Sequence, residues 1–527
     1  MTRSWPSSRP AWAADPVTPG ARLGLVAALA VATALLLPLG AVAWRAEGWT
    51  GLKTSDWGAL WFTLWQAAAS AALSVLLAIP VARALSRRRF PGRGGVILLL
   101  GAPFILPVIV AVLGLVAVFG RAGPVNLLLE ALNLGPLTIY GWHGVILAHV
   151  FFNMPLATRL ILQGWQGIPG ERLRLAASLG FTARDTQRFL ERPMLRAVVP
   201  GIFLVIFLIC TTSFAVALAL GGGPRATTVE LAIYQAFRFD FDLGRAAVLG
   251  AIQLALGTCA ALLSLRLTLP SGFGAGQDRV VPRWDSAGTG LKVQDGTAIL
   301  LACAFLLLPM AMILGDGLLH VAELPASVWW AALRSLVIAL SAAILTVALA
   351  LSMAVTVVTW RRGGLIEVAG TLAIAASPLV LGTGLYVLLL PLVNPIALAL
   401  PVTLFVNVVL GLPFALRALI PAMRDLHRDY GRLSASLGLS GLTWLRRVGL
   451  PRLRRPAGFA AGLTAALAAG DLGVIALFAT PDRATLPLML YQLMGSYRME
   501  EAKAAALLLI LLSLGLFWLF ERGSRDA

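Results

Sequence analysis

Charged residues are scarce in this sequence. Only 13% of its 527 residues are Asp, Glu, Lys or Arg, whereas 59% are hydrophobic. A soluble domain usually has about 25% charged residues, because its surface must interact with water. The composition therefore excludes an ordinary soluble protein, which cannot bury so much apolar surface. It indicates a chain that is embedded in a lipid bilayer.

Acidic residues are fewer than basic ones. The chain has 24 Asp and Glu against 42 Lys and Arg, which gives a net charge of +18. In a soluble protein such an excess would suggest nucleic-acid binding. Here the arginines lie in short segments between apolar runs, without the interleaved aromatic residues on which bases stack. We therefore expect no nucleic-acid partner and interpret the basic segments as loops on the cytoplasmic side of a membrane.

Residues for metal binding, cofactor binding and catalysis are also few. Three cysteines lie inside apolar runs, and four histidines are scattered without metal-ligand spacing. The chain has no G-x-x-x-x-G-K-[ST] motif, so it has no phosphate-binding loop of that kind for ATP. We expect no bound metal, no cofactor and no enzymatic activity. The residues in question are Cys210, Cys259, Cys303, His143, His149, His320 and His427.

Long apolar runs dominate what is present. A helix needs about 20 apolar residues to cross the hydrocarbon core of a bilayer. Twelve runs of suitable length predict an all-α polytopic membrane protein with twelve transmembrane helices. The runs are centred near residues 32, 70, 107, 151, 209, 256, 305, 343, 378, 408, 467 and 511.

The segments between these runs predict the topology. Arginine-rich segments alternate with acidic or mixed ones, and the positive-inside rule then places both termini in the cytoplasm. We predict a cytoplasmic tail over residues 1–20, a first half over 21–268, a cytoplasmic linker over 269–294 and a second half over 295–527.

The two predicted halves repeat each other. The sequence "SLG" at Ser178–Gly180 recurs 258 residues later, at Ser436–Gly438. Many matches at one offset predict two pseudo-symmetric halves of six spans each, in the same order and orientation. The same offset relates Pro155 to Pro413, Arg159 to Arg417, Pro193 to Pro451, Arg225 to Arg483 and Ala246 to Ala504.

Each half has one long arginine-rich segment on the predicted cytoplasmic side, over 171–196 and 429–454. A glycine in each permits the left-handed turn that ends a helix, and a proline breaks or begins the next element. The pattern predicts a helix–turn–helix that projects from the membrane. The alternative, a basic surface loop without function, is disfavoured because the segment recurs with the same internal spacing.

These segments resemble the EAA loop of binding-protein-dependent ABC permeases, since the spacing from glycine to proline matches in both halves. The resemblance implies coupling helices that dock onto two copies of a cytoplasmic ABC ATPase. The leading Glu of the family corresponds to Arg174 and Arg432, and an acid lies one helical turn earlier in each half. That acid forms either an intrahelical ion pair or a displaced contact with the ATPase. The implied coupling residues are Glu171, Arg174, Ala177, Gly180, Pro193, Asp429, Arg432, Ala435, Gly438 and Pro451.

Three further segments bear on the cargo. "ARALSRRRFPGR", "LGGGPRATTVELAIYQAF" and "ATLPLMLYQLMGSYR" are similar to the fused permeases of thiamine and thiamine-pyrophosphate importers. The resemblance implies a bacterial inner-membrane protein that receives thiamine or its phosphates from a periplasmic binding protein. Fused iron(III) permeases share the layout, so an iron(III) or other small-solute importer is the alternative. An ion-driven secondary transporter is disfavoured by the paired loops and the scarcity of intramembrane acids.

One acid within an apolar run is a candidate for the solute pathway. A carboxylate at the centre of a membrane helix costs about 2.5–3.5 kcal/mol, so Asp471 should face water or a partner. Its counterpart is Ser213, which follows Thr211 and Thr212. These residues either line a path for a cationic cargo, or Asp471 merely caps a broken helix or pairs locally.

The predicted outer segments between the last two spans of each half are also paired. Each contains arginine, tyrosine and glutamine, and they form either a gate, a dock for the binding protein or re-entrant helices that brace the pore. The candidate residues are Arg225, Tyr234, Gln235, Arg483, Tyr491 and Gln492.

Overall fold

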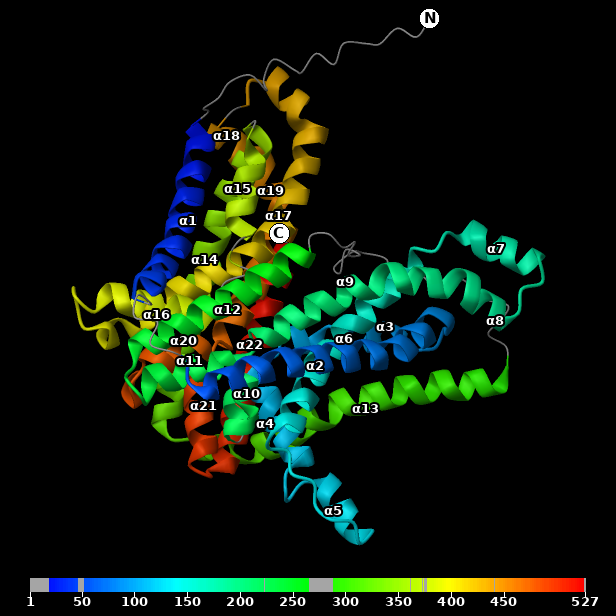
Figure 1. Cartoon of the computed structure of the whole chain (residues 1–527). Helices are drawn as coiled ribbons and strands as arrows, with labels where there is room; N and C mark the ends of the chain where they lie inside the picture. The colour runs from blue at the N-terminus through cyan, green and yellow to red at the C-terminus, as the bar shows by residue number, and fades with distance from the viewer. Residues whose placement is uncertain are drawn as a thin grey trace, which may run out of the picture. The chain divides into compact units, whose positions relative to one another are not determined.

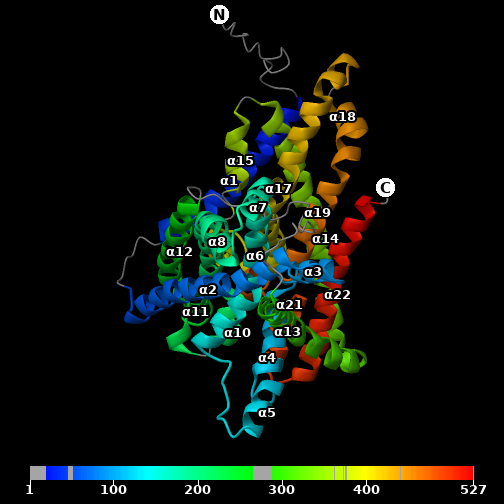
Figure 2. The same cartoon turned by 90° about the vertical axis from the view of Figure 1, so that its right-hand side faces the viewer.

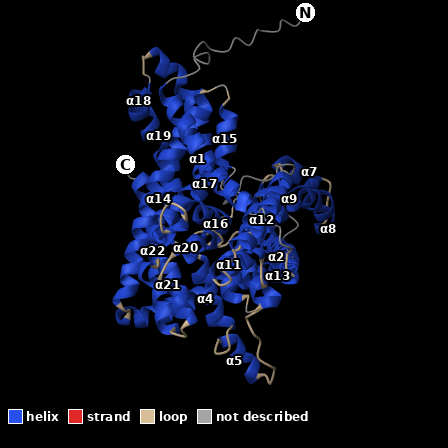
Figure 3. Cartoon of the chain, turned by 60° about the vertical axis from the view of Figure 1, so that its left-hand side comes forward, coloured by secondary structure: helices blue, strands red, loops and turns tan. Residues whose placement is uncertain are grey.

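The computed structural model describes residues 19–45, 52–221, 223–264, 288–360, 362–371, 373, 377–439 and 441–525. Most of the predicted tail and linker, residues 1–18 and 269–287, lie outside this part. Within the described ranges the regular structure is helical, without strands (Figure 3). This confirms the all-α prediction, and a helix suits a bilayer because it satisfies its own backbone hydrogen bonds.

The helices follow the apolar runs (Figure 1). Their bounds are α1 Pro19–Arg45, α2 Thr54–Arg87, α3 Arg93–Leu99, α4 Val108–Phe119, α5 Pro124–Ala131, α6 Trp142–Gln166, α7 Gly170–Ser178, α8 Ala183–Thr186, α9 Arg192–Thr211, α10 Phe214–Leu220, α11 Val229–Arg238, α12 Leu243–Ser264, α13 Thr289–His320, α14 Ala326–Thr359, α15 Gly363–Thr371, α16 Pro378–Leu389, α17 Ala399–Ser436, α18 Gly441–Trp444, α19 Leu450–Ala469, α20 Gly473–Phe478, α21 Leu486–Gly495 and α22 Met499–Arg525.

Eleven stretches of the described residues are long and apolar enough to cross a membrane. The polytopic character is confirmed, but the count of twelve is not. The run centred near residue 378 forms α16, whose 12 residues are too short for a complete span. Pro378 begins α16, so the proline breaks the run. The run near residue 107 breaks likewise, because Pro107 precedes α4.

The chain folds into two compact units that do not coincide with the sequence halves. Unit 1 comprises the described parts of residues 1–44, 330–485 and 511–527, and unit 2 those of 45–329 and 486–510. The first helix of each half therefore belongs with helices of the other half. In unit 1, α1 packs so closely on α14 that a Cβ on Gly24 would lie 2.0 Å from Thr356 Oγ1. In unit 2, a Cβ on Gly114 of α4 would lie 2.8 Å from the Pro309 carbonyl oxygen of α13.

Small side chains set the packing in both units. In unit 2, α2 and α6 pack along their length, and Ala67, Ala71, Ala78 and Ala82 of α2 are fully buried there. In unit 1, α17 packs on α19, and alanines of α14 and α19 form a second core. Alanine lets helix backbones approach closely, which is how helices associate within a membrane.

Large apolar side chains cover the outside of the spans. Leu23 is 68% exposed, Leu76 62%, Leu300 68% and Ile344 63%. Such exposure is unfavourable in water and expected against lipid chains. Exposed tryptophans near helix starts, among them Trp57, Trp61, Trp142 and Trp330, are typical of the membrane interface.

Candidate functional site

The two arginine-rich segments, residues 171–196 and 429–454, are called the first and second coupling segments below. The first lies in unit 2 and has the left-handed turn that its glycine predicts. Helix α7 ends at Ser178, and Gly180 takes the left-handed conformation with φ +69°. The Phe181 N–H donates to the Ala176 carbonyl at 3.0 Å, and the Gly180 N–H donates to Ala177 at 3.1 Å. This is the Schellman arrangement, which satisfies the last carbonyls of the helix. Helix α8, a π-helical turn and α9 then follow, and α7 and α8 lie at one end of α6 and α9 (Figures 1 and 2).

The second coupling segment, in unit 1, has the same turn. Gly438 has φ +64°, its N–H donates to Ala435 at 3.1 Å, and the Leu439 N–H donates to Ser434 at 2.9 Å. The elements after the turn also keep the 258-residue offset: the π-helical turns span Gln187–Glu191 and Leu445–Gly449, and α19 follows as α9 does. Pro193 and Pro451 are each the second residue of these helices, directly after the π-helical turns.

The two segments differ before the glycine. In the first half, α6 ends at Gln166 and α7 begins after Pro169, whereas α17 runs without a break from Ala399 to Ser436. The residue of the second half that corresponds to Pro169 is His427, which keeps its backbone N–H. Proline disfavours helix at the residue before it, so the first segment bends where the second continues.

The acids ahead of the glycines form local ion pairs. Glu171 accepts a hydrogen bond from Arg174 at 3.1 Å, and both side chains are 78% exposed. This geometry is the predicted intrahelical pair. Asp429 instead contacts its neighbour Arg428 at 3.2 Å, and Arg432 is exposed. Ion pairs as exposed as these stabilise little, so the carboxylates and guanidiniums remain available to another protein.

The coupling segments expose leucines that the sequence analysis did not single out. Leu175 and Leu179 are 59% and 63% exposed, and their counterparts Leu433 and Leu437 are 55% and 63% exposed. Pairs of leucines four residues apart lie on one face of a helix. The opposite face is buried through Leu173 and Ala176 in the first segment. Helical periodicity alone could have found this second apolar face.

A buried charge cluster anchors the first segment within unit 2. Glu191, at the end of the π-helical turn, lies 2.9 Å from Arg83 and 3.6 Å from Arg87. Arg87 also lies 3.9 Å from Asp295 of α13, and the Arg87 and Glu191 side chains are 1% and 2% exposed. The counterpart of Glu191 is Gly449, so the second segment has no carboxylate at that position.

The candidate pathway residues all occur at helix breaks. In unit 2, α9 ends at Thr211 and α10 begins after Ser213. The hydroxyls of Thr211 and Thr212 donate to backbone carbonyls one turn earlier, at 2.7 and 3.4 Å. In unit 1, α19 ends before Asp471 and α20 begins after it.

Asp471 makes local contacts. Its Oδ1 accepts a hydrogen bond from the Gly473 N–H at 3.0 Å, at the start of α20. Its Oδ2 accepts from Asn407 Nδ2 of α17 at 3.5 Å. The side chain is half-buried. The structure thus contains the capping arrangement that the sequence analysis considered for Asp471.

The outer segments are placed by aromatic and backbone contacts. In unit 2, Tyr234 of α11 packs between Phe214 and Phe239, with ring centroids 5.3 and 5.9 Å away. Burial raises the pKa of the Tyr234 phenol. Burial, with a smaller contribution from the charge of Tyr234, raises the pKa of Tyr491 of α21. In unit 1, Arg483 donates to the Ala397 carbonyl at 2.7 Å.

For three of the predicted outer residues the structure gives the degree of exposure. Arg225 is exposed, whereas Gln235 of α11 and Gln492 of α21 are half-buried. Gln235 directly follows Tyr234, and Gln492 directly follows Tyr491.

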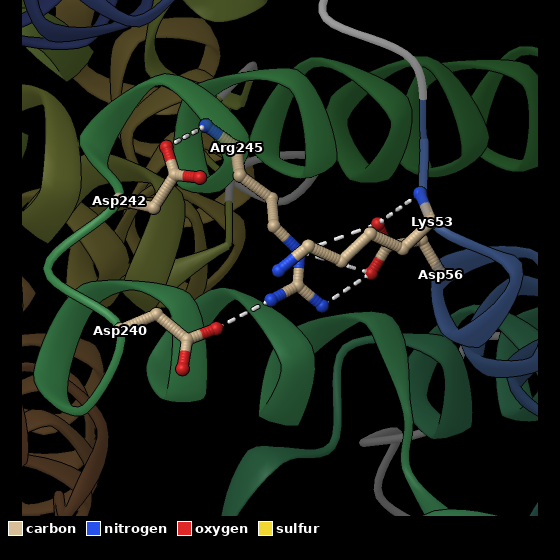
Figure 4. Close-up of polar contacts among 5 residues, drawn as sticks. All are labelled: Lys53, Asp56, Asp240, Asp242 and Arg245. Atoms are coloured by element: carbon tan, nitrogen blue, oxygen red, sulfur yellow. Dashed lines mark hydrogen bonds and ion pairs between the residues drawn. The ribbon is translucent and has the colours of Figure 1, made fainter.

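An ion-pair cluster joins the outer segment of unit 2 to the start of α2 (Figure 4). The Arg245 guanidinium binds Asp56 with Nη2–Oδ1 2.6 Å and Nε–Oδ2 3.2 Å, and it binds Asp240 with Nη1–Oδ2 2.6 Å. Asp56 also accepts from the Lys53 N–H, and Asp242 from the Arg245 N–H, both at 2.9 Å. The sequence analysis did not identify this cluster, whose members are distant in sequence.

The eleven apolar stretches among the described residues are those of a multi-pass membrane protein. No family model matches the sequence. Curated relatives do: the chain is 39% identical to the thiamine transport system permease protein ThiP of Brucella abortus, over 97% of this chain and 96% of the relative. It is 39% identical to the protein of that name in Escherichia coli, over 93% and 95%, and 34% identical to that of Haemophilus influenzae, over 85% of both. The chain belongs to the family of thiamine transport system permease proteins.

Proposed function

We propose that this chain is the permease subunit of an ATP-binding-cassette importer that moves thiamine, its phosphates or both from the periplasm to the cytoplasm by alternating access. The observation that supports thiamine as the cargo is the 39% identity, along 97% of the chain, to a protein named for thiamine transport. The iron(III) alternative has no such support. The chain provides the route, and separate subunits supply solute capture and ATP hydrolysis.

The paired coupling segments support the proposal for ATPase partners. Each presents two exposed leucines, an exposed acid and exposed arginines, on and just after α7 in the first half and at the end of α17 in the second. An apolar centre with a charged rim is the usual anatomy of a protein interface. Two such surfaces at equivalent positions of one chain match two copies of an ATPase. They would lie in the cytoplasm of a bacterial inner-membrane protein whose termini are both cytoplasmic, as the arginine-rich segments favour.

The test is ATP hydrolysis by the reconstituted complex. The purified chain should hydrolyse no ATP, and co-expression with the cognate ATPase should yield two ATPase copies per chain. With the cognate binding protein, thiamine or its pyrophosphate should stimulate hydrolysis and ferric ion should not. Stimulation by ferric ion alone would contradict the proposal that the cargo is thiamine or its phosphates. One ATPase copy per chain would contradict the proposal of two docking surfaces.

We propose that Asp471 contributes charge to the solute pathway in addition to capping α20. Thiamine is a cation, and the half-buried carboxylate is placed at a helix break beside Asn407. Thr211, Thr212 and Ser213 are the corresponding polar residues of the first half. The outer segments with Tyr234, Gln235, Tyr491 and Gln492 would form the gate or the dock for the binding protein.

Asp471→Asn should separate these two roles, because the amide oxygen still accepts from the Gly473 N–H while the charge is lost. We expect thiamine uptake to fall about tenfold, the equivalent of about 1.4 kcal/mol, with ATPase assembly unchanged. Asp471→Ala should also lose the cap, which costs about 1 kcal/mol of stability. Uptake by the Asn variant at the wild-type rate would leave capping as the role of this residue.

A further inference from the structure

Unit 1 contains a pocket of about 610 Å³ between three membrane-spanning helices. Its size falls within the range of about 300–1,000 Å³ that is typical of ligand sites. Helices α19 and α22 approach closely at its floor, because a Cβ on Gly458 would lie 2.4 Å from Ser524 Cβ. Its apolar walls include Ile344, Val347 and Leu351 of α14, Leu453 and Ala457 of α19, and Phe520 of α22.

The pocket opens toward the outside of the helices rather than into their core. Ile344 is 63% exposed and Leu450 is 43% exposed, although both are large and apolar. On spans of a membrane protein such side chains lie against acyl chains. The end of α22 carries Trp518 with Arg522 above its ring at 5.0 Å, and tryptophan and arginine are typical of the headgroup level. The pocket therefore extends from the headgroup level into the apolar layer.

The charge of the lining is positive. Arg446 lies in the π-helical turn and Arg454 one turn into α19, and the other lining residues include no acid. Among the described residues neither arginine has a carboxylate within ion-pair distance. Arg454 is half-buried at the pocket, and Arg446 is exposed. Two guanidiniums beside an apolar cavity are complementary to a phosphate that carries acyl chains.

We propose that this pocket binds an anionic phospholipid of the surrounding membrane. The phosphate would pair with Arg446 and Arg454, and an acyl chain would lie along α14 and α19. Pro451, in the second coupling segment, also lines the pocket. A bound lipid would thus brace the segment that lacks the buried carboxylate anchor of its counterpart. The proposal holds whatever solute the permease carries.

Native mass spectrometry of the full chain tests this, with phosphatidylglycerol and phosphatidylethanolamine as probes. Wild-type protein should retain phosphatidylglycerol preferentially. Arg446→Ala/Arg454→Ala should weaken its binding about 25-fold, since each arginine contributes about 1 kcal/mol near a membrane surface. Arg447→Ala/Arg455→Ala removes the same charge from neighbours that do not line the pocket, and binding should stay at the wild-type value.

A third variant tests the contribution of the cavity independently of the charge of the arginines. Ala348 is an exposed lining residue of α14, so Ala348→Trp should fill the cavity with the arginines intact and lower phosphatidylglycerol binding. Equal binding of the two lipids would overturn the proposal, as would wild-type lipid binding in the Arg446/Arg454 double variant or in Ala348→Trp. Full competition from soluble glycerol phosphate would also overturn it, because the acyl chains would then contribute nothing. If the double arginine variant fails to fold, the lipid comparison and Ala348→Trp decide the question.

Discussion

Arg245→Met should strongly destabilise the protein. The substitution leaves the Asp56 carboxylate, whose side chain is 1% exposed, without its guanidinium partner. Breaking a buried ion pair in this way costs about 3–5 kcal/mol, because an uncompensated charge stays buried. It also removes the ion pair through which Arg245 links Asp240 to the start of α2. We expect a large fall in the apparent unfolding temperature in detergent and in the amount of chain recovered from the membrane.

Two controls show whether the buried charge is the cause. Arg245→Met/Asp56→Asn removes both charges, so much of the lost stability should return. Arg174→Ala breaks the exposed pair with Glu171 and should leave the unfolding temperature unchanged. If Arg245→Met alone unfolds at the wild-type temperature, the cluster in Figure 4 is not a stabilising element.

Gly180→Val and Gly438→Val should abolish ATPase binding while the chain remains in the membrane. Both glycines have positive φ, which costs a β-branched residue about 1–2 kcal/mol or more. An added Cβ would meet nothing within 4 Å at either position, so the penalty comes from backbone conformation and not from a clash. The turn that orients the exposed leucines should therefore be lost without disturbing the spans.

Asparagine provides the matched control, because it tolerates the left-handed region. Gly180→Asn and Gly438→Asn should retain most ATPase binding, measured by co-purification and by the number of ATPase copies per chain. Each valine variant alone should lose one copy, and the double variant both. A double valine variant that binds two copies would show that these turns do not position the ATPase.

The secondary structure and the turn chemistry could be read from the sequence because they depend on local interactions. Gly180 and Gly438 were predicted to take left-handed turns, and both do. The apolar runs predicted the spans with one exception, α16, where Pro378 shortens the helix. Hydropathy counts residues and does not locate a break, so it overestimated the length of that span.

Long-range pairing could not be predicted in the same way. The partners Arg245 and Asp56 are 189 residues apart, and the cluster of Glu191 with Arg87 and Asp295 joins three separate helices. In a sequence with 42 basic residues, the local sequence does not indicate which arginine forms an ion pair with which acid. The exposed leucines of the coupling segments were missed for another reason, because a leucine in an amphipathic helix is usually buried.

The sequence by itself determined the class of protein and its repeated plan, because hydrophobicity, proline and glycine act through the solvent and the adjacent backbone. The resemblance to thiamine permeases also rests on the sequence alone. Only the tertiary structure decided that α1 packs with helices of the second half and α13 with those of the first. It also decided that Asp471 accepts a hydrogen bond from the Gly473 N–H at the start of α20 and that Arg446 and Arg454 border an apolar pocket. Those contacts depend on how helices pack, and packing brings together residues whose separation along the chain carries no signal.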